Sequence, residues 1–396
     1  MKMRESELRL QNFAEMNLSS EVMLSLAEMN VIEPTLVQSE ALPVAMARTD
    51  LIAIAQTGSG KTLAFALPIL AHFQKDPASR ALILVPSREM AMQIFGVFES
   101  LCAKAPIKAC LVIGGVPDNK QNSQLKKKPQ LIVATPGRMN DLLRDNKLLL
   151  QGVATIVIDE ADRMLDLGFA PQLKDIQKTL RGVWQTMLFS ATFGRDVETI
   201  AEIFMREDVV MVRAGDVNAP TSSLEQTVFF LPDGKKNDLM IEELKTTPGG
   251  AIVFADSQES AELVSQHLKQ NGQSVDLIHG DLSQGHRSRV VRDFRGGKFR
   301  VLVTTDLLAR GLDVAGVEQV INFDLPYKPE DFLHRIGRTA RAGRPGKAIT
   351  FITPGDRVKY EKIKPYLKGA REVTLPGAEI KRPRDFKKTY KKRSKK

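Results

Sequence analysis

Three carboxylates stand within four residues in the segment 154–162, which reads Ala-Thr-Ile-Val-Ile-Asp-Glu-Ala-Asp. Its first five residues carry no charge and include four β-branched side chains, a pattern typical of a buried strand. Asp159, Glu160 and Asp162 therefore follow the carboxyl end of a strand, where open parallel sheets bind ligands. Acidic residues that favour a helix N-terminus through its macrodipole explain the same pattern without a function.

A second segment of this kind precedes it, because the apolar run 51–55 is followed at once by residues 56–62, Gln-Thr-Gly-Ser-Gly-Lys-Thr. A strand, a glycine-rich turn and Gly-Lys-Thr at the start of a helix form a phosphate-binding loop. The glycines let backbone N–H groups approach phosphate oxygens, and the helix N-terminus adds partial positive charge. Lys61 is expected to reach the β- and γ-phosphates and Thr62 to contact Mg²⁺. Ala55 replaces the first glycine of the pattern, so this loop is a variant.

The composition sets limits on the class of protein. The chain has 396 residues, of which 43% are hydrophobic and 26% charged, as expected for a soluble globular protein of two or more domains. No apolar run is long enough to cross a bilayer, and the N-terminus has no secretory signal, so we expect a cytoplasmic location. Cys102 and Cys110 fit buried reduced thiols, and the five histidines lack the spacing of zinc ligands.

Alternating strand and helix patterns predict an α/β fold with parallel sheets. Polar or glycine residues follow several apolar runs, so one edge of the first sheet is expected to be functional. Residues 213–223 are small and polar, as is typical of an interdomain linker. We predict a first domain at 1–212, this linker, a second domain at 224–370 and a tail at 371–396. The predicted strands are 51–55, 81–85, 109–113, 131–134, 155–158 and 186–189, then 227–231, 251–255, 275–278, 301–305, 317–323 and 348–352.

The net charge of +10 is concentrated at the C-terminus. Residues 381–396 hold ten Lys or Arg residues and one Asp, so the first 380 residues carry only +1. We interpret this tail as a disordered arm that binds structured RNA through its phosphates, because charge of this density favours a polyanion. A terminus that only increases solubility is the alternative.

The ordered motifs of this chain resemble those of the DEAD-box RNA helicases, from about residue 13 to about residue 354. Residues 159–162, Asp-Glu-Ala-Asp, are the tetrapeptide that names the family. The other matching motifs follow in the family's order at 55–62, 86–91, 114–115, 135–138, 190–192, 304–313 and 334–341. The resemblance implies two RecA-like domains in tandem, with ATP in the cleft between them and RNA across both.

The resemblance also implies the roles of the ATP site. Thr62 and Asp159 would hold Mg²⁺, and Glu160 would orient or activate the attacking water. Arg338 and Arg341 would act as arginine fingers, with Lys61 on the phosphates. Among the residues implied in ATP binding, Gln38 would read the adenine edge, Phe13 would pack near the base and Asp313 would form a hydrogen bond with the ribose. The full implied set is Phe13, Gln38, Gln56, Thr57, Gly58, Ser59, Gly60, Lys61, Thr62 and Asp313.

For RNA, the family pattern implies contacts to the sugar–phosphate backbone and hence little sequence preference. These contacts would come from Arg88, Gly115, Thr135 and Arg138 in the first domain and from Gly280, Thr304 and Thr305 in the second. Asp162, Ser190, Thr192 and His334 would couple the nucleotide state to domain closure. The implied function is an RNA-stimulated ATPase that unwinds short duplexes or remodels RNA–protein complexes, acting as a monomer. By analogy with short bacterial members, ribosome assembly or RNA turnover is the expected setting.

Two departures from the family pattern concern the ATP site. Ala340 replaces the usual glycine between the two arginine fingers and adds a methyl group where packing is tight. The usual Gly-aromatic pair before Pro34 is Asn30-Val31 here.

Val31 cannot stack on adenine as an aromatic ring does, so we predict that Val31→Phe lowers the Michaelis constant for ATP. Steady-state ATPase assays over a range of ATP concentrations check this, and an unchanged Michaelis constant would count against it.

Two other functions remain open from the sequence. One is an ATP-gated clamp that holds RNA and rarely turns over, although Glu160, Arg338 and Arg341 favour an enzyme. The other is a DNA translocase, because a contact to the RNA 2′-hydroxyl, which distinguishes RNA from DNA, is invisible in sequence.

Overall fold

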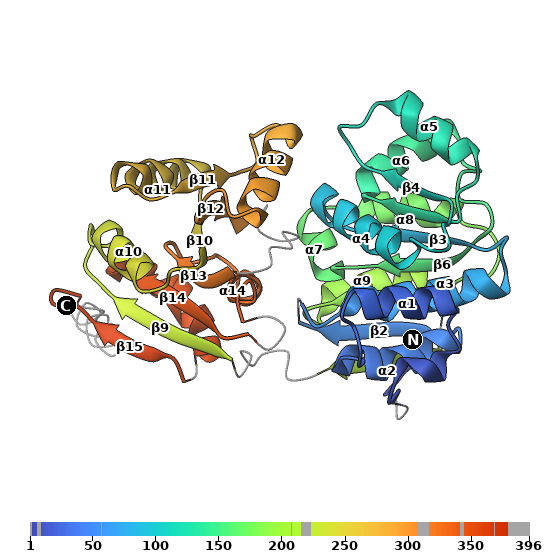
Figure 1. The fold of residues 1–396 in the computed structure, drawn as a ribbon, viewed down its shortest axis with the longest axis horizontal. Helices are drawn as coiled ribbons and strands as arrows, with labels where there is room; N and C mark the ends of the chain where they lie inside the picture. Colours follow the sequence, from blue (N-terminus) through green and yellow to red (C-terminus); the bar gives the residue numbers. More distant parts are fainter. Residues whose placement is uncertain are drawn as a thin grey trace, which may run out of the picture. The chain divides into compact units, whose positions relative to one another are not determined.

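The computed structural model describes residues 2–5, 9–56, 58–206, 208–214, 223–306, 317–340, 344–367 and 369–378. The chain divides into two compact units, Met1–Val217 (domain 1) and Asn218–Lys396 (domain 2). Each unit is a parallel sheet with helices on both faces, which confirms the predicted α/β class with two parallel-sheet domains (Figure 1). Among the described residues, no helix is both long and apolar enough to span a membrane.

Domain 1 contains an eight-stranded sheet in the order β1-β8-β2-β7-β6-β3-β5-β4, with all pairs parallel. The predicted buried runs form its centre. Its strands are β1 (Lys2–Glu5), β2 (Asp50–Ala55), β3 (Arg80–Leu84), β4 (Ala109–Val112), β5 (Leu131–Ala134), β6 (Val153–Ile158), β7 (Gln185–Ser190) and β8 (Asp208–Ala214).

Helices cover both faces of this sheet because successive strand residues point to opposite sides. In β2, Leu51 and Ala53 pack with one helix layer and Ile52 and Ile54 with the other. The first layer holds η1 (Phe13–Met16), α1 (Ser20–Glu28), α2 (Leu36–Met46), α3 (Lys61–Lys75) and α4 (Arg88–Leu101), and the second holds α5 (Asp118–Lys126), α6 (Pro136–Asp145), α7 (Ala161–Asp166), α8 (Ala170–Thr179) and α9 (Arg195–Phe204).

The helix that follows the phosphate-binding loop is anchored firmly to the sheet. Phe65 of α3 meets Phe189 of β7 edge to face, with ring centroids 5.3 Å apart, and both rings are fully buried. Such a pair contributes about 0.5–1.5 kcal/mol beyond the burial of its surface. The N-terminus of α3 is therefore held on a rigid element.

Domain 2 contains a seven-stranded parallel sheet in the order β11-β12-β10-β13-β14-β9-β15. Its elements are β9 (Leu224–Phe230), α10 (Lys236–Lys245), β10 (Gly250–Ala255), α11 (Gln258–Gln270), β11 (Val275–Ile278), α12 (Gln284–Arg295), β12 (Val301–Thr305), β13 (Val317–Asn322), α14 (Pro329–Ile336), β14 (Gly346–Ile352), η2 (Pro354–Asp356), α15 (Arg357–Ile363), η3 (Lys364–Leu367) and β15 (Arg371–Thr374). Helices α10 and α11 cover one face and α12, α14 and α15 the other.

Two predicted boundaries differ from the structure. Strand β8 continues to Ala214, so Arg213 and Ala214 lie in the sheet and not in a linker. Strand β15 pairs with β9 inside the segment assigned to the tail. β15 is an edge strand with charged residues and no apolar run. β8 contains the apolar run 209–212, but its last two residues, Arg213 and Ala214, have the character of the polar segment that follows. Residues 215–222 and 379–396 lie outside the described residues.

Candidate functional site

The phosphate-binding loop adopts backbone geometry that requires glycine. Gly58 and Gly60 have φ of 84° and 96°, in the left-handed region, and α3 begins directly afterwards at Lys61. Gly60 also lies against another element, because a Cβ atom at this position would be 2.5 Å from Gln38 Nε2 and 2.9 Å from Thr35 Oγ1. Only glycine satisfies both the turn and the close approach.

Gln38 joins this loop to the N-terminal segment. Its Nε2 donates to Gly60 O at 3.0 Å, and its Oε1 accepts from Thr35 N at 3.0 Å, with the side chain 1% exposed. The amide is thereby fixed beside the loop. Phe13 is a core residue, 3% exposed, within η1.

Lys61 brings a buried cation to the carboxylates that follow β6. Its Nζ donates to Ala55 O at 3.0 Å, and the side chain is 7% exposed. Burial raises the pKa of Asp159 to about 6, the charge of Lys61 lowers it, and the neighbouring Glu160 raises it. The structure thus places the two predicted motifs, nearly one hundred residues apart in sequence, in electrostatic contact.

Glu160 occupies a strained position at the end of β6. Its φ is 51° and its ψ 53°, left-handed values that a non-glycine residue seldom adopts. Its side chain is 4% exposed, and within the described residues Glu160 Oε2 has no hydrogen-bond partner. Strain and unmet hydrogen bonding at a buried acid are typical of functional sites.

The residues present fit a magnesium–nucleotide ligand. Two buried carboxylates, Asp159 and Glu160, face one buried lysine, and Ser59 Oγ in the loop is also buried without a partner among the described residues. No group of three His, Cys, Asp or Glu side chains in the described ranges could hold a metal alone. Mg²⁺ is commonly bound by one or two protein carboxylates together with phosphates and water, and Asp159 is a buried carboxylate of this kind.

Asp162 links this site to the end of the neighbouring strand β7. Its Oδ2 accepts from Thr192 N at 3.2 Å and from Thr192 Oγ1 at 3.0 Å, and Ser190 Oγ also accepts from Thr192 N at 3.4 Å. The three residues predicted to couple the site in domain 1 therefore form one hydrogen-bonded unit.

The predicted RNA-binding residues of domain 1 lie at the same edge of the sheet, after β3, β4 and β5. Arg88 begins α4, and its guanidinium lies against the backbone of Gly114 and Gly115, since Cβ atoms there would be 2.7 and 2.8 Å from its nitrogens. Thr135 is the N-cap residue of α6, which contains Arg138. Strand order therefore separates the nucleotide motifs on β2, β7 and β6 from this group on β3, β5 and β4.

In domain 2, the predicted residues also follow strand ends. Gly280 comes after β11, and Thr304 and Thr305 end the adjacent β12, with 0% and 8% exposure. His334 lies on α14, and Arg338 follows it; Arg338 is 3% exposed and donates from Nε to His334 O at 3.0 Å. Thr57, Asp313, Arg341 and the segment 381–396 lie outside the described residues.

Arg335 is a residue of this site that the sequence did not single out. It is 1% exposed, its Nη2 donates to Asp306 Oδ2 at 2.7 Å, and its Nε donates to Asp306 Oδ1. Its Nη1 donates to Asn322 Oδ1 and to Asp324 O, and its guanidinium lies 5.0 Å from the Phe254 ring centroid. This residue fastens the end of β12, directly after Thr305, to the helix that precedes Arg338. Asp306, an acid immediately after a buried strand, was the available signal.

Ala340 has a φ of 55°, in the region that favours glycine, and is 5% exposed. An L-residue in the left-handed conformation costs about 1–2 kcal/mol, partly offset by its smaller entropy loss on folding. We therefore expect Ala340→Gly to raise the free energy of unfolding of domain 2 by about 0.5–1 kcal/mol, measured by urea denaturation. Ala103→Gly is the control, because Ala103 is exposed and has no positive φ, so this change should not stabilise the protein. Equal effects of both substitutions on the free energy of unfolding would show that the backbone at Ala340 is not strained.

Comparisons with known proteins identify the families that the two domains match. The family model described as DEAD/DEAH box helicase matches residues 35–200, and that described as Helicase conserved C-terminal domain matches residues 235–343. The chain is 38% identical over 367 residues to the DEAD-box ATP-dependent RNA helicase CshA of Geobacillus kaustophilus, with 92% of this chain and 78% of the relative covered. It is 36% identical to DEAD-box ATP-dependent RNA helicase 30 of Arabidopsis thaliana over 92% of this chain, but spans only 63% of that relative's length.

A solved structure is also similar to this chain over most of its length. Dbp5 of S. cerevisiae, bound to RNA and ADP BeF3, is similar with a TM-score of 0.82 and 32% sequence identity, and the match covers 92% of this chain and 96% of that one.

Proposed function

The chain belongs to the DEAD-box family of ATP-dependent RNA helicases, and from this premise we propose that it hydrolyses ATP in response to RNA and separates short RNA duplexes locally. The observation that carries the proposal is the single sheet edge in domain 1. There the phosphate-binding loop and Lys61 meet Asp159 and Glu160, and Arg88 and Gly115 follow strands of the same sheet.

ATP binding is proposed at the loop between β2 and α3. The backbone N–H groups of residues 56–60 and the N-terminus of α3 favour the phosphates, and Lys61 neutralises their charge. Gln38, fixed beside Gly60, would recognise the adenine edge through its amide, with Phe13 supporting it from the core. Asp313 is proposed to bond the ribose.

For hydrolysis, Glu160 is proposed to accept a proton from the attacking water, because its Oε2 is buried and has no partner in the described structure. Thr62 and Asp159 would hold Mg²⁺, which would neutralise negative charge on the phosphates. Arg338 and Arg341 remain proposed arginine fingers.

Coupling is proposed to run through the Asp162–Thr192–Ser190 unit in domain 1 and through His334 in domain 2. Arg335 joins this set as a residue that positions both Thr305 and the segment carrying Arg338.

RNA is proposed to contact Arg88, Gly115, Thr135 and Arg138 in domain 1 and Gly280, Thr304 and Thr305 in domain 2. The basic tail at 381–396 would add contacts to structured RNA. The charged and backbone groups on the sheet edge suit sugar and phosphate, so low sequence preference is expected. Ribosome assembly or RNA turnover remains the proposed setting.

Gly115→Ala tests the RNA site. The new Cβ would be 2.8 Å from Arg88 Nη1 at a φ of +81°, so the guanidinium must move and the turn is strained. We expect RNA affinity, measured by fluorescence anisotropy with labelled single-stranded RNA, to fall by about tenfold, as for loss of one strong charged contact. Gly96→Ala is the matched control, because it lies in α4 with no atom within 4 Å of its new Cβ. Unchanged RNA affinity for Gly115→Ala would contradict the assignment.

An ATP-gated RNA clamp with slow turnover is the alternative function. The clamp would have the same ATP and RNA sites as the enzyme, but RNA would not increase its ATPase rate. This difference in RNA stimulation distinguishes the two functions experimentally.

A further inference from the structure

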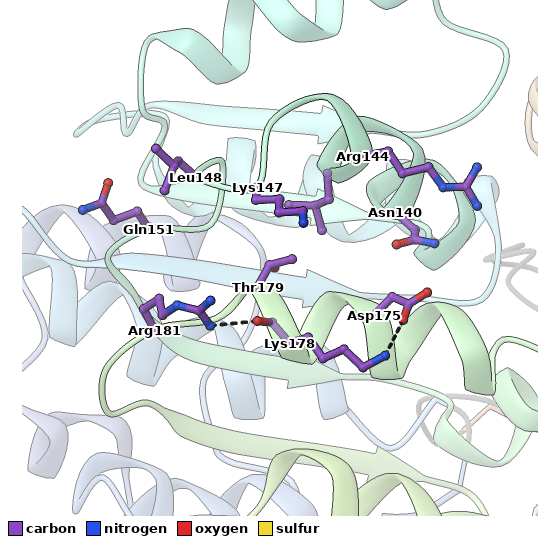
Figure 2. Close-up of a pocket in the computed structure, with 10 residues that line it drawn as sticks. Asn140, Arg144, Lys147, Leu148, Gln151, Asp175, Lys178, Thr179 and Arg181 are labelled. Atoms are coloured by element: carbon purple, nitrogen blue, oxygen red, sulfur yellow. Dashed lines mark hydrogen bonds and ion pairs between the residues drawn. The ribbon is translucent and has the colours of Figure 1, made fainter.

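A hollow of about 430 Å³ lies in domain 1 between α6 with its following loop and the end of α8. Its volume is that of an ordinary ligand-binding cleft. Figure 2 shows Arg144, Lys147, Leu148 and Gln151 on one side and Asp175, Lys178, Thr179 and Arg181 on the other. None of these residues takes part in the function proposed above.

The hollow lies at the opposite edge of the sheet from the nucleotide site. Gln151 is two residues before β6, and Arg181 is four residues before β7, whereas Asp159 and Thr192 follow the far ends of the same strands. Strand β6 has six residues, so this end of the hollow lies about 20 Å from the nucleotide site. The lining extends along α6 as far as Asn140, two residues after Arg138, but it shares no residue with the predicted ATP and RNA contacts of domain 1.

The lining is strongly basic. Four cations, Arg144, Lys147, Lys178 and Arg181, face one carboxylate, Asp175, which pairs with Lys178 at 2.9 Å. Arg144 also pairs with Asp141 at 3.7 Å, but the side chains of Arg144 and Lys178 are 74% and 71% exposed, so solvent screens both pairs and a ligand can reach the cations. An anionic partner is required to complement this surface.

The loop that forms one wall is held rigidly and presents an apolar side chain. Arg80, itself buried, donates from Nη1 to Leu149 O at 3.0 Å and to Gln151 O at 2.6 Å, and Asn146 Oδ1 accepts from Leu148 N at 3.0 Å. Leu149 and Leu150 are thereby buried, while Leu148 is left 69% exposed. The hollow therefore presents an exposed apolar side chain, Leu148, among its cations.

The opposite wall is polar and charged, with Asp175, Lys178, Thr179 and Arg181. Arg181 Nη1 donates to Lys178 O and Leu180 O at the end of α8, which holds its guanidinium in place. The exposed Leu148 side chain of the first wall offers nothing to a phosphate backbone, so it favours a peptide over RNA. The chain's own tail is excluded as the occupant, since it is itself basic.

We propose that this hollow, lined by Arg144, Lys147, Leu148, Gln151, Lys178 and Arg181, docks an acidic peptide segment of a partner protein that carries apolar anchor residues. Carboxylates of the peptide pair with the four cations, and its apolar side chains cover Leu148. The partner would attach to domain 1 without occupying the proposed ATP and RNA sites there.

The test uses the full chain and a fluorescein-labelled probe peptide, Glu-Glu-Leu-Glu-Asp-Leu-Phe-Glu-Asp-Leu, with a second probe that has lysine in place of every acid. We expect the acidic probe to bind and its affinity to fall at least about tenfold in Lys147→Glu/Arg181→Glu. The lysine-substituted probe should bind to Lys147→Glu/Arg181→Glu more tightly than it binds to the unchanged chain. Leu148→Ser should weaken binding of the acidic probe but should not create binding of the lysine-substituted probe.

Lys75→Glu/Lys108→Glu is the matched control, with the same charge change at two exposed lysines outside the hollow. ATPase rate and binding of labelled single-stranded RNA report that each variant is folded, and both should be unchanged. Absence of acidic-probe binding, or equal loss in both double variants, would overturn the proposal. Loss of RNA affinity in Lys147→Glu/Arg181→Glu alone would assign the hollow to RNA and would also overturn it.

Discussion

Replacing Glu160 by Gln is expected to lower the RNA-stimulated ATPase rate by about 10²–10⁴-fold, the usual contribution of a general base. The amide is nearly isosteric but cannot accept a proton from water. Because Glu160 is buried with an unpartnered Oε2 in the described structure, the substitution removes one buried negative charge and leaves the fold in place. ATP and RNA binding, measured by fluorescence anisotropy, should therefore be retained or tightened.

Glu202→Gln on α9 is the control, because the Glu202 side chain is exposed and the substitution removes the same charge. Its ATPase rate should equal that of the unchanged protein. A Glu160→Gln protein that turns over within a few-fold of the unchanged protein would exclude Glu160 as the base.

Lys61→Met is expected to have the second large effect, a loss of at least about 10²–10³-fold in kcat/KM for ATP, as for removal of one preorganised electrostatic group. Methionine fills the buried space but has no charge for the phosphates. The pKa of Asp159 should also rise further, because burial already raises it to about 6 and the charge of Lys61 opposes that rise. The carboxylate is then a weaker metal ligand near neutral pH.

The matched control is Lys75→Met, at the exposed last position of the same helix. It should leave kcat/KM unchanged, and circular dichroism should show both variants folded. Equal activity of Lys61→Met and Lys75→Met would contradict the phosphate-binding role of the loop.

The central strands and the positions of their functional ends could be predicted, because each buried parallel strand is a continuous apolar run with polar residues directly after it. The runs at 131–134, 275–278 and 301–305 coincide with β5, β11 and β12. Strands β1 and β15 could not be found in this way, because both are edge strands that carry charged side chains and lack such a run.

Side-chain arrangement was less accessible to sequence. The Asp162–Thr192 hydrogen bonds join residues thirty positions apart in sequence, which the parallel pairing of β6 with β7 brings together. The buried Arg335–Asp306 pair likewise depends on how α14 packs beside β12. The hollow in domain 1 depends on how α6 and its following loop, with the turn at Asn146, pack beside the end of α8, and no sequence motif marks that packing.

The measurement that tests the central claim most directly is the steady-state ATPase rate of the full chain without nucleic acid, with single-stranded RNA and with DNA of the same sequence, with Glu160→Gln as the control. The account predicts strong stimulation by RNA, little by DNA and none in Glu160→Gln. Equal stimulation by DNA would contradict specificity for RNA, and a flat rate despite RNA binding would replace the enzyme with an ATP-gated clamp.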